Sequence, residues 1–298
     1  MHPRHASHRA PAFTLVELLV VVGIIVLLVG LLFVSLAQFY RHARQTACLS
    51  KQRQIALASA AYAADSDGRF PSPRTDARAC AAAPFTMNSW VDTAAAGGFV
   101  NGIETTASLE AGRLWNYLNA DASAYKSPQD WTDAFTRVRS YSLNAFVGVG
   151  ERNYNARAND NYDFPSPDHP QTPAAQRGKW FNTTTLAQIP QPARTMCSIS
   201  EEDSAGYNTH GWIIALHPSD THAGFGQWLD SPALWNGSRV NISNLDGSIE
   251  ALDILYDSLR EQFESQASSH GLVEGGTRPA FKAMADRMLP GIIDPALQ

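Results

Sequence analysis

Consecutive acidic side chains are the first residues in this chain whose type and spacing could do chemistry. Glu201, Glu202 and Asp203 follow one another, and carboxylate oxygens are ligands that Ca²⁺ prefers. A solvated acidic turn accounts for the same residues and is the interpretation we favour, with calcium as the alternative. No nucleophile elbow or phosphate-binding glycine loop accompanies them. We therefore expect no catalysis and no required cofactor.

The cysteines limit the redox chemistry of the chain. There are three, Cys48, Cys80 and Cys197, so at most one disulfide can form and one thiol is left over. Cys48 is expected either to remain a structural thiol or to form a bridge to Cys80 or Cys197. The sequence does not choose between these pairings.

One carboxylate lies in an unusual place, near the start of a long apolar run. Residues 13–37 contain a single charged side chain, Glu17. A helix of this length covers ~37 Å, enough to cross a hydrocarbon core of ~30 Å with some tilt. A carboxylate at such a position is costly and is rarely accidental. The helix dipole favours negative charge in the first turn, and a neighbouring cation would favour it further.

Three interpretations of the apolar run compete. It could be an uncleaved membrane anchor, or a secretory signal peptide cut after Ser35-Leu36-Ala37, although the run exceeds the usual ~7–15 apolar residues. The third is a prepilin-type leader, in which the cut precedes the run. Basic residues occur on both flanks of the run, so the positive-inside rule does not determine topology.

The residues around Glu17 support the third interpretation through a family resemblance. The segment 12–20 (AFTLVELLV) resembles the processing site of type IV pilins and type II secretion pseudopilins. The resemblance implies cleavage between Ala12 and Phe13 by a prepilin peptidase, and methylation of the new amino group. Glu17 would then neutralise the Phe13 ammonium of an adjacent subunit. The family usually has Gly where this chain has Ala12.

Further segments resemble a large pseudopilin-like family that is abundant in planctomycetes and verrucomicrobia. They follow in order at 48–57, 62–65 and 68–71, then at 112–118, 125–130, 140–144, 192–195 with 201–204, and 246–247. The family usually has Cys where Ser127 stands and His where Asn236 stands. The resemblance implies a subunit in the bacterial inner membrane with a single span and a periplasmic head. It also implies other pilins or pseudopilins and an inner-membrane assembly platform as partners.

The apolar run is predicted to continue as a helix to residue 64. Residues 40–64 contain no Gly or Pro and are rich in good helix formers. Cys48, Ile55 and Tyr62 recur at seven-residue spacing and could form a stripe that lies against a sheet. The residues 65–68 (DSDG) are expected to end the helix, because Gly supplies a left-handed cap.

The predicted fold is α+β and pilin-like, with a long N-terminal helix packed on a mostly antiparallel sheet. The expected parts are a leader (1–12), a membrane helix (13–37), its continuation (38–64), a head (65–256) and a C-terminal helical tail (257–298). Strands are expected at 141–147, 195–200, 211–216, 239–243 and 248–252. Asp246-Gly247 predicts a hairpin turn between the last two.

The net charge of the chain disfavours nucleic-acid binding as its function. Lys and Arg number 23 against 28 Asp and Glu, a net charge of −5, and non-specific nucleic-acid binders normally carry a basic face. We therefore expect no nucleic-acid partner, which disfavours a minor pilin for DNA uptake. The alternatives that remain are a major type IV pilin of a surface filament and a membrane-anchored periplasmic enzyme or carbohydrate-binding protein.

Overall fold

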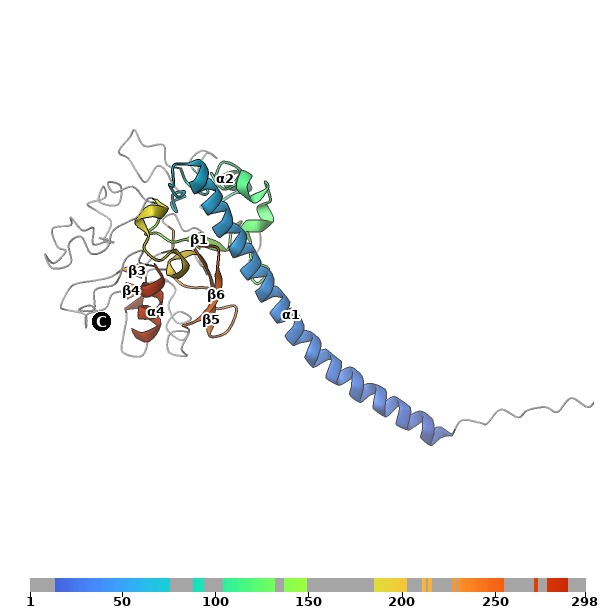
Figure 1. Ribbon diagram of the computed structural model, residues 1–298. Coiled ribbons are helices and arrows are strands. Elements are labelled where there is room, and N and C mark those ends of the chain that lie inside the picture. The colour runs from blue at the N-terminus through green and yellow to red at the C-terminus, as the bar shows by residue number, and fades with distance from the viewer. Residues whose placement is uncertain are drawn as a thin grey trace, which may run out of the picture. The chain divides into compact units, whose positions relative to one another are not determined.

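The computed structural model describes residues 14–75, 88–93, 104–131, 137–148, 185–202, 211–212, 214–215, 227–228, 230–254, 271–272 and 278–288. The chain divides into two compact units, Met1–Arg44 and Gln45–Gln298. In the first unit the described residues, 14–44, include the N-terminal part of one long helix, and its residues 15–37 are called the apolar part below. The second unit, the head, holds every strand described (Figure 1).

Helix α1 (Leu15–Asp65) is a single helix of 51 residues, which confirms the predicted continuation beyond the apolar run. It ends where the sequence predicts. The Gly68 amide donates to the Ala63 carbonyl at 2.8 Å, and Gly68 has φ +80°, a conformation that glycine adopts without steric cost.

A four-stranded antiparallel sheet lies at the centre of the head, with the strand order β1-β2-β5-β6. Together with helix α1 it confirms the α+β class. The strands are β1 (Tyr141–Leu143), β2 (Met196–Ser200), β5 (Arg239–Asn244) and β6 (Ile249–Asp253). The short helices around the sheet are α2 (Thr106–Glu110), η2 (Asn116–Leu118), η3 (Ala122–Tyr125), η4 (Leu186–Gln188) and η5 (Pro192–Arg194).

The hairpin expected at Asp246-Gly247 is present between β5 and β6. Ser243 pairs with Ile249, and Gly247 has φ +85°. The Asp246 carboxylate accepts hydrogen bonds from the amide and hydroxyl of Ser248, at 2.9 and 2.6 Å. These bonds lower the pKa of Asp246, and the pair serves as a turn.

Strand β1 is shorter than the expected 141–147 because Asn144 turns the chain. Its side-chain oxygen accepts a hydrogen bond from the Phe146 amide at 3.0 Å, a local turn that competes with strand pairing. Its side-chain nitrogen donates to the carbonyls of Met196 and Met288, at 2.9 and 2.7 Å. One buried amide therefore joins β1, β2 and the C-terminal helix.

The described residues of the C-terminal segment, 271–272 and 278–288, belong to the same compact unit as the four-stranded sheet. Strand β7 (Gly271–Leu272) extends a second antiparallel sheet with β3 (Ile214–Ala215) and β4 (Gln227–Trp228). Helix α4 (Arg278–Met288) buries an apolar face at its Phe281, Met284 and Met288. The sequence predicted a helical tail at 257–298, and helix α4 lies within that range. A helical pattern does not by itself reveal which surface its apolar face covers.

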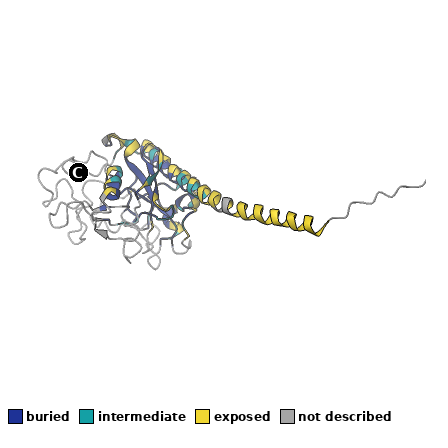
Figure 2. Ribbon diagram, turned by 90° about the horizontal axis from the view of Figure 1, so that it is seen from below, coloured by how far each residue is buried: buried dark blue, intermediate teal, exposed yellow. Residues whose placement is uncertain are grey.

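Two apolar cores occur among the described residues, and both include residues of the four-stranded sheet. In Figure 2 much of the described head is dark, or buried, whereas the apolar part of α1 is yellow, or exposed. Alternate residues of a strand point to opposite faces. Val240 and Ile242 belong to the core that contains α4. Leu143 and Leu245 belong to the core that contains the head part of α1. Burial on both faces explains why β2 and most of β5 are buried.

Candidate functional site

The first turn of helix α1 is organised by Thr14 and Glu17. The Glu17 carboxylate accepts hydrogen bonds from the Thr14 amide and hydroxyl, at 2.9 and 2.8 Å. The Glu17 amide donates in return to the Thr14 hydroxyl at 3.2 Å. This reciprocal arrangement is a capping box, which satisfies amides that the helix start leaves free. Glu17 therefore has a local structural role in addition to the assembly role expected from the sequence.

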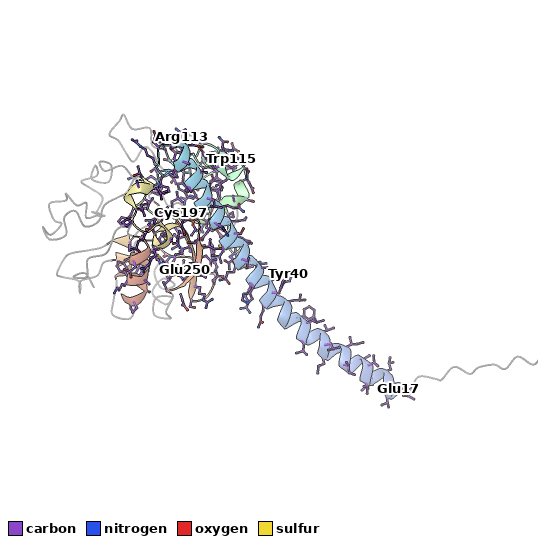
Figure 3. All side chains as sticks on the ribbon, viewed as in Figure 1. Glu17, Tyr40, Arg113, Trp115, Cys197 and Glu250 are labelled. Carbon is purple, nitrogen blue, oxygen red and sulfur yellow. The ribbon has the colours of Figure 1, made fainter. Side chains whose placement is uncertain are left out.

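Apolar side chains surround Glu17 and remain exposed along the helix. Leu15, Val16, Leu18 and Leu19 are all more than half exposed, and Figure 3 shows the side chains of this part of α1 projecting around the ribbon. Among the described residues, α1 is the one helix long and apolar enough to cross a membrane, and a signal sequence would meet the same criterion. Ala12 and Phe13, the expected processing site, lie outside the described residues.

The head part of α1 packs on the sheet through the predicted stripe, with Cys48, Ile55 and Tyr62 buried. Polar residues that the pattern did not indicate lie in the same contact. Gln52 is completely buried, and its amide nitrogen donates to the Ser200 hydroxyl at 2.7 Å and the Asn241 carbonyl at 2.8 Å.

Charged residues are buried at the edge of the sheet. Arg139 is 6% exposed and forms an ion pair at 2.7 Å with Glu104, which is 3% exposed. The Arg139 guanidinium also donates to the Tyr141 carbonyl and the Ser142 hydroxyl, at 3.1 and 2.8 Å. It lies 5.4 Å from the centre of the Trp90 ring. Buried charges persist only when they are paired in this way, so this cluster joins separate segments of the head.

Of the three acidic residues considered for calcium, the structure describes Glu201 and Glu202. Glu201 is buried and accepts a hydrogen bond from the Ser142 hydroxyl. Glu202 is exposed and accepts one from the Leu234 amide at 3.4 Å. Asp203 lies outside the described residues. Within the residues that the structure describes, no group of three potential metal-ligating side chains occurs.

Two of the cysteines considered for a disulfide are free thiols. Cys48 and Cys197 are both buried and unbridged, and Cys80 lies outside the described residues. The Cys48 sulfur lies 3.4 Å from the Ser200 hydroxyl. Burial raises the pKa of Cys197 from 9.0 to about 12, which keeps its thiol protonated. These cysteines serve as packed core residues, one of the outcomes left open for Cys48.

The raised pKa of Cys197 predicts a loss of stability at alkaline pH. Above pH 9 the unfolded thiol releases its proton while the folded thiol, with a pKa of about 12, retains it. The free energy of unfolding should therefore fall as the pH rises from 9 to 12. Urea unfolding of the detergent-solubilised protein at pH 7, 9 and 10.5 measures this fall. A Cys197→Ala variant, normalised to pH 7, should show a shallower fall, and equal slopes would contradict the prediction.

Comparisons with known proteins assign no family to this chain. No protein-family model, no curated protein and no solved structure matches it.

Two features of the structure, the capping role of Glu17 and the ion pair between Glu104 and Arg139, differ in how far the sequence indicates them. The capping role of Glu17 has a local signal, because Thr14 and Glu17 have the Thr-x-x-Glu spacing of a capping box. The ion pair between Glu104 and Arg139 has no such signal, because its partners lie 35 residues apart.

Proposed function

We propose that this protein is a structural subunit of a type II secretion system or a related type IV filament system. Prepilin peptidase would cut it between Ala12 and Phe13 in the inner membrane, with the head in the periplasm. The apolar part of α1 would then leave the bilayer and pack against the same part of neighbouring subunits. The subunit itself would catalyse no reaction.

The observation that carries this proposal is the single carboxylate on an exposed apolar helix. Glu17 is the one charged residue in the apolar run, and the nearest basic residue among those described is Arg41, 24 positions along the chain. A carboxylate in apolar surroundings requires a cation or strong donors. The Phe13 ammonium of a second subunit would supply that cation, because processing creates it four residues before Glu17.

The two parts of helix α1 differ in burial, as the proposed function requires. The head part of α1 is already packed on the sheet through Cys48, Ile55 and Tyr62. The apolar part keeps its large side chains exposed, as expected of a surface that is covered first by lipid and then by other subunits.

The mature N-terminus tests the proposal. Mass spectrometry of the protein from membrane fractions should find a chain that starts at Phe13 with a methylated amino group. A strain that lacks prepilin peptidase should retain the intact chain. A chain that starts at Gln38 would indicate a cleaved signal peptide, and an intact Met1 in the presence of the peptidase would indicate a simple anchor. Either result would overturn the proposal.

A further inference from the structure

An aromatic pair followed by basic residues lies at the end of the apolar part of α1. Phe39 and Tyr40 are 65% and 59% exposed, and their ring centroids lie 6.1 Å apart in an edge-to-face arrangement. Arg41 and His42 follow directly and are exposed. We call these four residues, 39–42, the interfacial collar. Figure 3 labels Tyr40 and Glu17 on the same helix.

The length of the helix places the collar at a membrane surface. From Leu15 to Phe39 the rise is ~36 Å, slightly more than a hydrocarbon core of ~30 Å. With Leu15 at one edge of the core, Phe39 and Tyr40 reach the headgroup layer on the other side. Aromatic side chains are enriched at that level, because one part of the ring is apolar and another tolerates water.

The charged residues that follow the collar along helix α1 are all basic as far as residue 64. Residues 38–64 include Arg41, Arg44, Lys51 and Arg53 and contain no Asp or Glu. The collar therefore has no acidic neighbour within its own stretch of helix to neutralise Arg41. A guanidinium binds phosphate oxygens through parallel hydrogen bonds, and beside a leaflet that contains anionic lipids a basic residue is attracted by about 1 kcal/mol.

We propose that the interfacial collar binds the headgroups of anionic phospholipids and enriches them around the helix. Phe39 and Tyr40 set the depth of the helix, and the Arg41 guanidinium selects anionic over zwitterionic headgroups. The inference rests on the membrane-inserted state that the proposed function requires, but not on processing or filament assembly. Extraction of the subunit for assembly then includes release of these lipids.

Energy transfer from the full-length protein to labelled lipids tests the proposal. A donor dye on Gln38→Cys, in a Cys80→Ser background, reports on lipids beside the collar. The protein is reconstituted in vesicles of phosphatidylcholine with 20% phosphatidylglycerol, using matched acceptors on either lipid. We expect several-fold enrichment of the phosphatidylglycerol acceptor, reduced about fivefold in Arg41→Gln and strongly reduced at 1 M salt, where the Debye length is ~3 Å.

Two further variants serve as controls for Arg41→Gln. Arg41→Lys should retain much of the enrichment, and Arg53→Gln, a change of the same kind within the head, should leave it unchanged. Equal transfer to both acceptors would overturn the lipid proposal while leaving insertion intact. Absence of transfer to either acceptor would show that the helix does not insert, which overturns the proposed function as well. Enrichment that appears only at high protein density would assign the collar to contacts between copies instead.

Discussion

Replacement of Glu17 by alanine should reduce incorporation of the protein into filaments more than tenfold, without preventing insertion into the membrane or cleavage. Assembly would place this carboxylate in an apolar bundle, where its attraction to a neighbouring ammonium is much stronger than in water. Without it, the Phe13 ammonium of the next subunit would be buried without a partner, and one buried unpaired charge is strongly destabilising. Immunoblots of sheared filament fractions and of membrane fractions measure the two pools.

Because Glu17 also caps the helix, a second variant is needed to separate its charge from its capping hydrogen bonds. Alanine removes both the charge and the hydrogen bonds that Glu17 accepts from Thr14. Glutamine at the same position still completes a capping box but has no charge. We therefore expect Glu17→Gln to be as defective as Glu17→Ala. Assembly of the Gln variant at the level of the wild type would show that Glu17 acts only as a helix cap.

Thr14→Ala supplies the complementary control. It removes the hydroxyl that caps the helix and keeps the carboxylate. Loss of an N-cap side chain costs about 0.5–2 kcal/mol of helix stability, which frays the first turn without abolishing the ion pair. Incorporation of this variant should fall less than that of Glu17→Gln.

Arg139→Met should lower the free energy of unfolding of the protein by about 3–5 kcal/mol. The substitution removes the ion pair at 2.7 Å with the Glu104 carboxylate, which is 3% exposed. It also removes the hydrogen bonds to Tyr141 and Ser142. Urea unfolding in detergent, followed by tryptophan fluorescence, measures the change.

A double variant separates the effect of the lost ion pair from the effect of the lost packing. Glu104→Leu combined with Arg139→Met replaces both charges by apolar groups, and it should recover part of the stability lost in Arg139→Met. The ion pair between Arg287 and Glu250, at 2.9 Å and 20% and 34% exposed, is the matched control. Arg287→Met should cost about 1 kcal/mol or less. A double variant less stable than Arg139→Met would contradict the role of the buried charge.

Local patterns predicted the elements that depend on near neighbours in the chain. The stretch without Gly or Pro predicted the extent of α1, and Asp246-Gly247 predicted the hairpin that the structure contains. The buried stripe at Cys48, Ile55 and Tyr62 was also predicted correctly. In each case the cause lies within one or two helical turns or one tight turn, so the sequence itself carries the information.

Contacts between distant segments were not predictable in the same way. Gln52 is a good helix former in an apolar stripe, and its burial is explained by Ser200 and Asn241, which lie 148 and 189 residues away. The amphipathic pattern of α4 shows that one face is apolar, but not that this face joins the core beside β5. The burial of Arg139 likewise depends on Glu104, which lies on another segment.

The amino-acid sequence by itself therefore determines the long helix, the hairpin and the apolar run with its single carboxylate. Folding of the head determines which polar residues are buried, that the Cys48 and Cys197 thiols are free and packed in the core, and that the C-terminal helix belongs to the head. Helix and turn formation depends on bonds between residues a few positions apart. Burial and pairing depend on which distant segments meet, because a buried polar group is stable only beside the partner that satisfies it.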